Sequence, residues 1–186
     1  MPLHIFRSQM SVGSTRMLDD TVRSLVAVYT ALKNQIKDLD RQLQAYARQS
    51  PVCRLLMTVP GVGPLTALAF VSTVDDPNRF SRSRTVGAYF GLTPRRYQSG
   101  ELDTNGRISK CGDSLMRTYL FEAATTLLSR VQKWSALKAW GIRLAKRTGM
   151  KKAKIAVARK LAVVMHSMWL TGEPFRWSEK PASAST

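Results

Sequence analysis

A strict heptad pattern runs through residues 22–46, VRSLVAVYTALKNQIKDLDRQLQAY. The spacing places its apolar residues on one narrow seam of a helix, as at the a and d positions of a coiled coil. We therefore expect a coiled-coil helix over residues 21–49, after a loose lead-in at residues 1–20. The seam consists of residues at alternating steps of three and four: Val22, Leu25, Tyr29, Leu32, Ile36, Leu39, Leu43 and Tyr46.

A lone helix would leave this seam exposed to water, so the pattern also indicates a partner helix. The partner would come from a helical hairpin or from a second copy of the chain in a homo-oligomer. The alternative interpretation is an ordinary amphipathic helix that lies on the rest of the domain.

Helix start and stop signals divide residues 50–177 into short helical segments. Ser50 and Pro51 are typical of an N-cap followed by proline at the first helical position. The region 91–112 is rich in Gly, Pro, Ser and Asn, and it predicts a loop or a short hairpin that includes Ser99-Gly100 and Asn105-Gly106. The fold class expected is all-α, with a disordered tail at residues 178–186. Helices are expected at about 51–57, 64–74, 83–90, 113–130, 135–148 and 150–170.

The chain of 186 residues is strongly basic, with 29 Lys and Arg, 12 Asp and Glu, and a formal net charge of +17. Hydrophobic residues make up 44% of it, so a core can form. The excess positive charge indicates a polyanionic partner, with nucleic acid as the first candidate and an anionic membrane as the second.

The membrane interpretation is disfavoured, because no apolar run reaches the roughly 18 residues of a membrane helix and the N-terminus lacks a signal-peptide pattern. We expect a cytoplasmic, nucleoid-associated protein. Cys53 and Cys111 lie too far apart for a zinc knuckle and indicate a reducing compartment.

The stretch Val59-Pro60-Gly61-Val62-Gly63 joins two of the expected short helices. Two glycines permit a tight turn with exposed backbone N–H groups, and the helix that follows directs its N-terminal amides outward. This arrangement resembles a helix-hairpin-helix, a module that binds the DNA backbone without reading sequence. The candidate DNA contacts are Gly61, Val62 and Gly63, and the alternative is a glycine-rich connection with no ligand.

The second half of the chain has an unusual distribution of charge. Between Ala123 and Gly172 there is no Asp or Glu, whereas there are eleven Lys and Arg. Solvated protein surfaces usually mix the two signs, so this stretch indicates phosphate contacts that are blind to sequence and weaken with salt. The candidates for these contacts are Arg143, Lys146, Arg147, Lys151, Lys152 and Arg159.

Ser109 lies in the stretch Gly106-Arg107-Ile108-Ser109-Lys110-Cys111-Gly112-Asp113, just before an expected helix. Cations and helix amides near a serine lower the cost of an alkoxide-like nucleophile and can hold the phosphate to be attacked. Arg107, Lys110 and Arg117 would supply that positive charge and contact DNA. From the residues alone, a turn or capping serine is the favoured interpretation.

Other polar and aromatic groups give weaker indications of chemistry. His166 lies on an apolar helix and is expected to pack there, and His4 shows no catalytic pattern. Pairs of neighbouring aspartates are better explained by turns and helix starts than by a two-metal site. The four tryptophans could stack on bases, but we expect them mainly to pack in the core.

An ordered series of motifs resembles the C-terminal transposase domain of the insertion-sequence family numbered one hundred and ten, with its one-hundred-and-sixteen and nine-hundred-and-two relatives. The resemblance covers about residues 50–170, and a coiled-coil segment precedes this domain in the family. The motifs are Val59-Pro60-Gly61-Val62-Gly63, the stretch from Phe80 to Gly87-Ala88-Tyr89-Phe90-Gly91-Leu92-Thr93-Pro94, Ser99-Gly100, and Gly106-Arg107-Ile108-Ser109-Lys110 followed by Gly112-Asp113 and Leu115-Met116-Arg117.

The resemblance implies that Ser109, which matches the family's serine, attacks DNA covalently. It also implies a RuvC-like N-terminal domain that binds magnesium through four acids, and in some members a guide RNA encoded by the element. No such acidic domain is found in residues 1–21, so we expect no cofactor in this chain and magnesium only with the missing domain. The expected function is the C-terminal part of a transposase or site-specific recombinase. The alternatives are a non-catalytic DNA-binding remnant or regulator of a transposable element, and more distantly an RNA-binding module.

Overall fold

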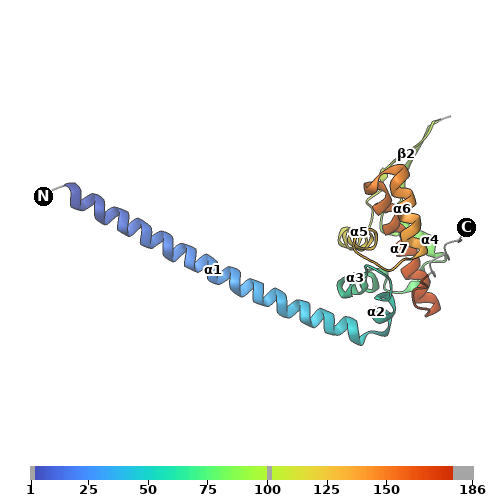
Figure 1. Ribbon diagram of the computed structural model, residues 1–186, viewed down its shortest axis with the longest axis horizontal. Helices are drawn as coiled ribbons and strands as arrows, with labels where there is room; N and C mark the ends of the chain where they lie inside the picture. Colours follow the sequence, from blue (N-terminus) through green and yellow to red (C-terminus); the bar gives the residue numbers. More distant parts are fainter. Residues whose placement is uncertain (1–2, 100–101, 178–186) are drawn as a thin grey trace, which may run out of the picture. The chain divides into compact units, whose positions relative to one another are not determined.

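The computed structural model describes residues 3–99 and 102–177, and of residues 3–16, 96–99 and 102–105 it describes the backbone alone. The chain divides into two compact units, Met1–Gln42 and Leu43–Thr186. The structure is mostly α-helical, as expected, with one small antiparallel hairpin (Figure 1).

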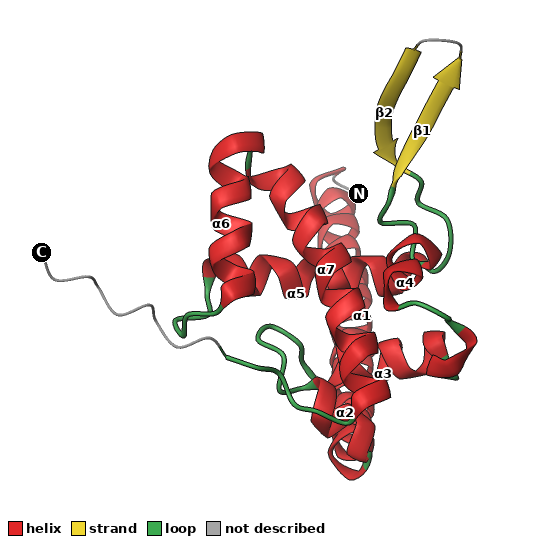
Figure 2. Cartoon of the chain, turned by 90° about the vertical axis from the view of Figure 1, so that its right-hand side faces the viewer, coloured by secondary structure: helices red, strands yellow, loops and turns green. Residues whose placement is uncertain are grey.

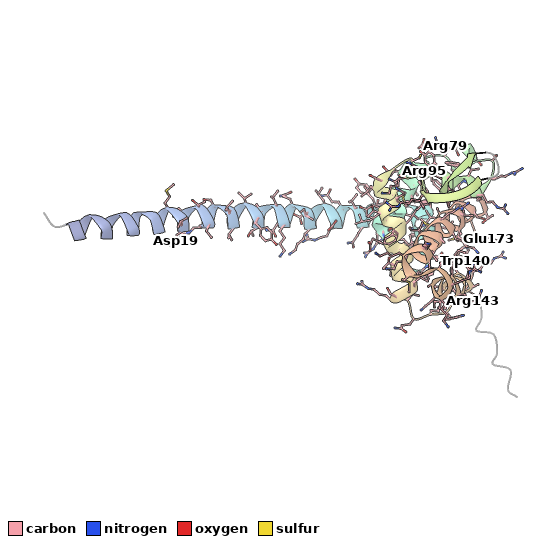
Figure 3. All side chains as sticks on the ribbon, turned by 90° about the horizontal axis from the view of Figure 1, so that it is seen from above. Asp19, Arg79, Arg95, Trp140, Arg143 and Glu173 are labelled. Carbon is pink, nitrogen blue, oxygen red and sulfur yellow. The ribbon has the colours of Figure 1, made fainter. Side chains whose placement is uncertain are left out.

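The first unit consists of most of helix α1, which spans Leu3–Gln49. We expected a loose lead-in at residues 1–20, whereas the helix begins at Leu3. No proline follows Pro2 in this segment and Gly13 is its one glycine, which costs a helix only about 1 kcal/mol. The residues of the predicted heptad seam are 40–65% exposed. Figure 3 shows the described side chains of α1 standing out from the helix.

Helices of the second unit begin and end close to the positions that the sequence indicated. They are α2 (Pro51–Leu56), α3 (Pro64–Val74), α4 (Ser83–Tyr89), α5 (Ser114–Ser129), α6 (Ala136–Thr148) and α7 (Met150–Thr171), with a 3₁₀ turn η1 at Pro77–Arg79. The N-caps of α2, α5 and α6 are Ser50, Asp113 and Ser135, whose side chains accept hydrogen bonds from backbone amides.

The hairpin consists of β1 (Pro94–Ser99) and β2 (Leu102–Ile108), which pair in antiparallel fashion. It confirms the prediction of a short hairpin within residues 91–112. Asn105 and Gly106 lie in this hairpin, inside β2, where Asn105 pairs with Arg96. Ser99-Gly100, which we also expected in the hairpin, falls partly outside the described residues. The register shifts between Pro94 and Arg96, next to the point where the strands join the helices.

Helix α7 lies at the centre of the second unit and packs against α2, α4, α5 and α6 (Figure 2). Its buried residues Leu161 and Met165 belong to one continuous hydrophobic core. The rings of Phe70 and Phe90 lie 5.7 Å apart in this core, and Trp169 packs against Phe70 at 6.3 Å. Burial of these apolar side chains holds the short helices together, because helices of their length are unstable alone.

His166 of α7 is fully buried, as expected for a packed residue. Its Nε2 atom lies 2.8 Å from the carbonyl oxygen of Pro77, and its Nδ1 atom lies 3.0 Å from the hydroxyl of Ser83. A carbonyl can only accept, so Nε2–H donates to Pro77. His166 therefore joins α7 to the 3₁₀ turn η1 and to the first residue of α4.

Candidate nucleic-acid interface

Two loops that are distant in sequence hold Ser109 between them. The first leads from α4 into β1, and the second leads from β2 into α5. The amide of Ser109 donates to the carbonyl of Thr93 at 2.8 Å, and the amide of Lys110 donates to the carbonyl of Gly91 at 3.1 Å. The two peptide groups that flank the Ser109 side chain are thus both hydrogen-bonded to the first loop.

The two loops approach so closely that only glycine fits at the crossing point. Gly91 has a φ of +65°, a conformation that side chains disfavour. A β-carbon at Gly91 would overlap the backbone carbonyl and amide of Cys111, well inside the 3.0 Å below which real Cβ contacts are essentially never found. Gly91 therefore has a steric role, because it lets the two loops cross at the base of the loop that carries Ser109.

Arg117 holds the same junction from the first turns of α5. Its Nη1 atom donates to the carbonyls of Cys111 at 2.7 Å, Gly112 at 3.0 Å and Phe90 at 3.3 Å. The guanidinium thus bridges both loops through their backbone. We predicted that Arg117 contacts DNA, and the structure places it in this internal network.

Ser109 is half-buried, and its carbonyl accepts a hydrogen bond from Nη2 of Arg95 at 3.1 Å. It does not cap α5, since the cap is Asp113, whose carboxylate accepts from the amide of Met116 at 2.5 Å. The capping interpretation of Ser109 is therefore wrong, whereas the interpretation as a turn serine stands.

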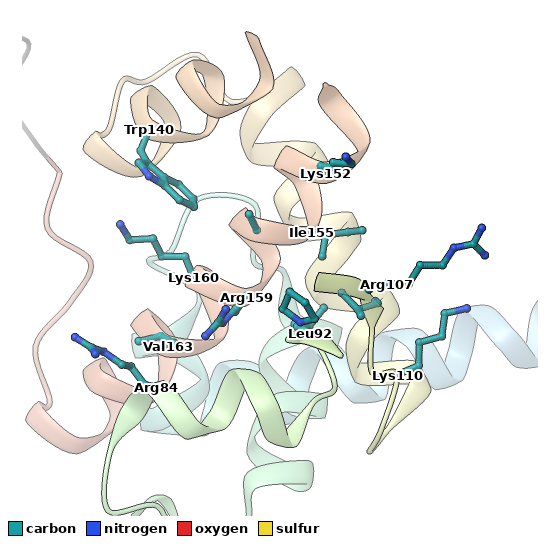
Figure 4. Close-up of a pocket in the computed structure, with 14 residues that line it drawn as sticks. Arg84, Leu92, Arg107, Lys110, Trp140, Lys152, Ile155, Arg159, Lys160 and Val163 are labelled. Carbon is teal, nitrogen blue, oxygen red and sulfur yellow. The ribbon is translucent and has the colours of Figure 1, made fainter. Parts of the chain in front are cut away.

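A groove of about 1200 Å³ lies next to this loop, between α4, the base of the hairpin, α6 and α7 (Figure 4). Its lining contains six cationic side chains and no acidic one. Figure 4 shows Trp140 and Lys160 toward one side of the groove and Arg107 and Lys110 toward the other. The cations come from four elements or loops: Arg84, Arg107, Lys110, Lys152, Arg159 and Lys160.

Local packing sets the positions of two of these cations. The stem of Arg159 crosses α4 at Gly87, where a β-carbon would lie only 2.8 Å from Cγ of the arginine. The ammonium of Lys160 lies 4.6 Å from the ring centroid of Trp140, within the range of a cation–π contact. Both charged residues remain exposed to solvent. The groove therefore presents positive charge that is not neutralised by neighbouring carboxylates of its lining.

The structure brings some of the predicted DNA contacts together and leaves others apart. Arg107, Lys110, Lys152 and Arg159 line the groove, next to the Ser109 loop. Four others are exposed elsewhere, on α6 or at the start of α7: Arg143, Lys146, Arg147 and Lys151. Arg143 lies one helical turn beyond Trp140 on α6 (Figure 3).

Three charged or aromatic lining residues were not among the predicted DNA contacts: Arg84, Trp140 and Lys160. Helical spacing could have found Lys160, since Lys152, Ala156, Arg159 and Val163 recur on the same face of α7. Arg84 and Trp140 come from other helices, and no pattern in the sequence joins them to α7.

The predicted helix-hairpin-helix turn packs against α5. Gly61 has a φ of +88°, and a β-carbon there would lie 2.5 Å from the carbonyl oxygen of Ala123. Val62 is only 7% exposed. Close packing explains the first glycine of the motif, and phosphate binding at Gly61, Val62 and Gly63 stays a prediction.

The described residues contain no group of three or more His, Cys, Asp and Glu side chains placed to hold a metal ion. A search of the described helices for a membrane span, by length and hydropathy, finds none.

Comparison with known proteins supports the family resemblance that the ordered motifs indicated. Residues 53–139, which include Ser109, match the model of the transposase IS116/IS110/IS902 family. The transposase for insertion sequence element IS1111A of Coxiella burnetii is 36% identical over 158 residues, which are 83% of this chain and 43% of that protein. A putative transposase of Sinorhizobium fredii, y4pF/y4sB, is 33% identical over 84% of this chain and 41% of its own length.

A probable family 20 transposase of Pseudomonas aeruginosa is 30% identical over 81% of this chain and 45% of its own length. The chain thus spans less than half the length of each of these three relatives. The match runs through the glycine crossing, the Arg117 network and the hairpin that joins them. The chain belongs to the IS116/IS110/IS902 transposase family.

Proposed function

We propose that this chain is the DNA-handling part of an insertion-sequence transposase, which binds the DNA backbone and supplies Ser109 as a nucleophile. The observation that carries the proposal is the set of six cations, without an acid, that lines a groove beside the rigid Ser109 loop. A phosphodiester held by those cations would lie next to a serine whose backbone is fixed.

The groove cations act on phosphates rather than on base edges. Lysine ammonium groups and arginine guanidinium groups bind phosphate oxygens by charge-assisted hydrogen bonds and release counterions from DNA. Such contacts position DNA without reading its sequence. Arg107 lies two residues before Ser109 in the sequence, and Lys110 follows it directly. The same cations that bind a phosphate would therefore also stabilise the negative charge that develops on it during attack.

The proposed reaction is a transesterification. The Oγ atom of Ser109 attacks a backbone phosphorus atom, and one new P–O bond forms while the P–O bond to the leaving sugar oxygen breaks. The serine proton passes to solvent, and the leaving oxygen takes up a proton in turn. The number of phosphoester bonds stays the same, so the step needs no oxidant or energy source, and it is reversible when a second DNA end replaces the first.

The exposed seam of α1 supports a second part of the proposal, self-association. Val22 and Ile36 are β-branched residues at two of the four a positions of the seam, whereas Leu25, Leu32 and Leu39 occupy three of its four d positions. This distribution favours a parallel two-stranded coiled coil. Two copies of the chain would each contribute one helix and one Ser109, as an exchange between two DNA strands requires.

The decisive experiment is Ser109→Ala in a recombination assay in which the chain is supplied with a separate RuvC-like domain of its family. We expect DNA binding within about twofold of the wild type and loss of strand exchange, since removal of an activated nucleophile leaves the binding groups intact. Ser129→Ala, at the exposed end of α5, is the matched control and should recombine normally.

Strand exchange by Ser109→Ala at the wild-type rate would disprove the nucleophile. If the variant also binds DNA normally, the chain would act as a non-catalytic DNA-binding protein or regulator. Competition between duplex DNA and structured RNA at two salt concentrations separates a DNA partner from a guide RNA.

A further inference from the structure

We infer that the groove accepts a stretch of unpaired DNA, with bases against its apolar floor and phosphates along its cationic rim. The inference rests on the proposed function, because it takes DNA as the partner. It goes beyond that function by assigning single-stranded rather than duplex DNA to this one groove and by giving Trp140 a role.

The floor of the groove is apolar, which a surface for duplex DNA does not require. It is formed by Leu92, Ile108, Ile155, Val163 and the ring of Trp140. All but Leu92 are only half-buried, so they present apolar surface to the solvent in the groove. In a duplex the base faces are stacked on each other, and only the edges and the phosphates reach a protein. Unpaired bases expose their faces and can cover such a floor.

The rim provides charge on both sides of that floor. Arg84, Arg159 and Lys160 come from α4 and α7, and Arg107 and Lys110 come from the hairpin and the Ser109 loop. A cationic groove combined with an aromatic side chain is the usual arrangement in proteins that bind single strands. The volume of about 1200 Å³ exceeds the roughly 300–1,000 Å³ of sites for drug-sized ligands, so the groove has room for more than one nucleotide.

Trp140 is the group best suited to stack on a base. Its side chain is half-buried, and the ammonium of Lys160 lies over its ring at 4.6 Å. Lys160 is exposed, so its ammonium can move from the ring to a phosphate and leave the ring face to a base. In this exchange the ammonium of Lys160 gains a phosphate partner, and the ring of Trp140 gains a stacked base.

The lining predicts little sequence preference. None of the fourteen lining side chains carries a hydrogen-bond acceptor. Discrimination among bases uses acceptors as well as donors, whereas the lysine and arginine side chains of the groove can only donate.

The test is fluorescence anisotropy with the full chain and a labelled oligothymidylate, beside a duplex of equal length and an oligouridylate. Trp140→Ala should weaken binding of the single-stranded DNA by about 5-fold to 100-fold, the usual effect of losing one stacked base, and change duplex binding by less than about twofold. Trp134→Ala is the matched control, because Trp134 is 40% exposed and does not line the groove. It should leave both affinities unchanged.

Trp140 also packs against the core, so a direct measurement must accompany the substitution. An oligonucleotide that contains 5-iododeoxyuridine, irradiated with the wild-type chain, should crosslink to Trp140. Crosslinks that map only outside the groove would overturn the inference. Equal losses of single-stranded and duplex binding in Trp140→Ala, or RNA binding about tenfold tighter than DNA binding, would overturn it as well.

These outcomes distinguish the inference from the proposed function. If the chain binds duplex DNA but Trp140→Ala binds single-stranded DNA as the wild type does, the inference fails and the proposed function stands. If the chain binds neither form of DNA at low salt, both fail.

Discussion

The crossing of the two loops at Gly91 makes a quantitative prediction for the substitution Gly91→Ala. The added β-carbon would overlap the backbone of Cys111 and would also occupy a residue with a φ of +65°. No rotation can relieve the overlap, because an alanine side chain has no torsion that moves its β-carbon. The loops must separate, and the amides of Ser109 and Lys110 then lose their partners Thr93 and Gly91.

The magnitude follows from two contributions. Positive φ at a residue other than glycine costs about 1 kcal/mol. Loss of the two hydrogen bonds, or the overpacking that would preserve them, costs about 2 kcal/mol more. We therefore expect Gly91→Ala to lower the free energy of unfolding by about 3 kcal/mol, and to reduce strand exchange strongly because Ser109 moves with its loop.

The matched control is Gly172→Ala, at the end of α7. Gly172 has a nearly equal φ of +70°, but a β-carbon there meets nothing within 4 Å. This variant should lose only the conformational contribution of about 1 kcal/mol. Urea unfolding followed by circular dichroism measures both values. Equal losses of stability in the two variants would refute the idea that the loops are sterically locked at Gly91.

Three further variants test other parts of the structure. Arg117→Met removes a donor to three backbone carbonyls and should cost about 1–3 kcal/mol in urea unfolding, whereas Arg143→Met should cost almost nothing; equal costs would contradict the internal role. Asp113→Ala removes the cap of α5 and should lower stability by about 1 kcal/mol, and an unchanged unfolding midpoint would contradict it. Ile36→Asp places a charge in the α1 seam and should yield monomers in analytical ultracentrifugation, while Lys37→Asp, outside the seam, should not; self-association retained by Ile36→Asp would exclude the coiled coil.

Much of the helical structure follows from local signals in the sequence. Ser50-Pro51 and Asp113 begin helices where capping and proline geometry predict, and Gly149 separates α6 from α7. These signals act over a few residues, so they can be recognised in the sequence without knowledge of the tertiary structure. The extension of α1 to Leu3 escaped prediction, because residues 3–20 lack a regular apolar period and contain no strong helix breaker.

The candidate site was predictable only in part. Ser109, Arg107 and Lys110 are adjacent in sequence, and their resemblance to a family motif identified them together. The contribution of Trp140 and Arg84 depends on the packing of α6 and α4 against α7, which no local pattern reveals. The role of Arg117 was also hidden, since its partners are backbone carbonyls and leave no trace in side-chain patterns.

Both proposals require that the positive charge of this chain binds a nucleic-acid backbone. The salt dependence of its affinity for duplex DNA measures that binding. If about six cations contact phosphates, the logarithm of the association constant should fall with the logarithm of salt concentration at a slope of about −5. Absence of any complex at low ionic strength, or an affinity that does not change with salt, would refute these phosphate contacts.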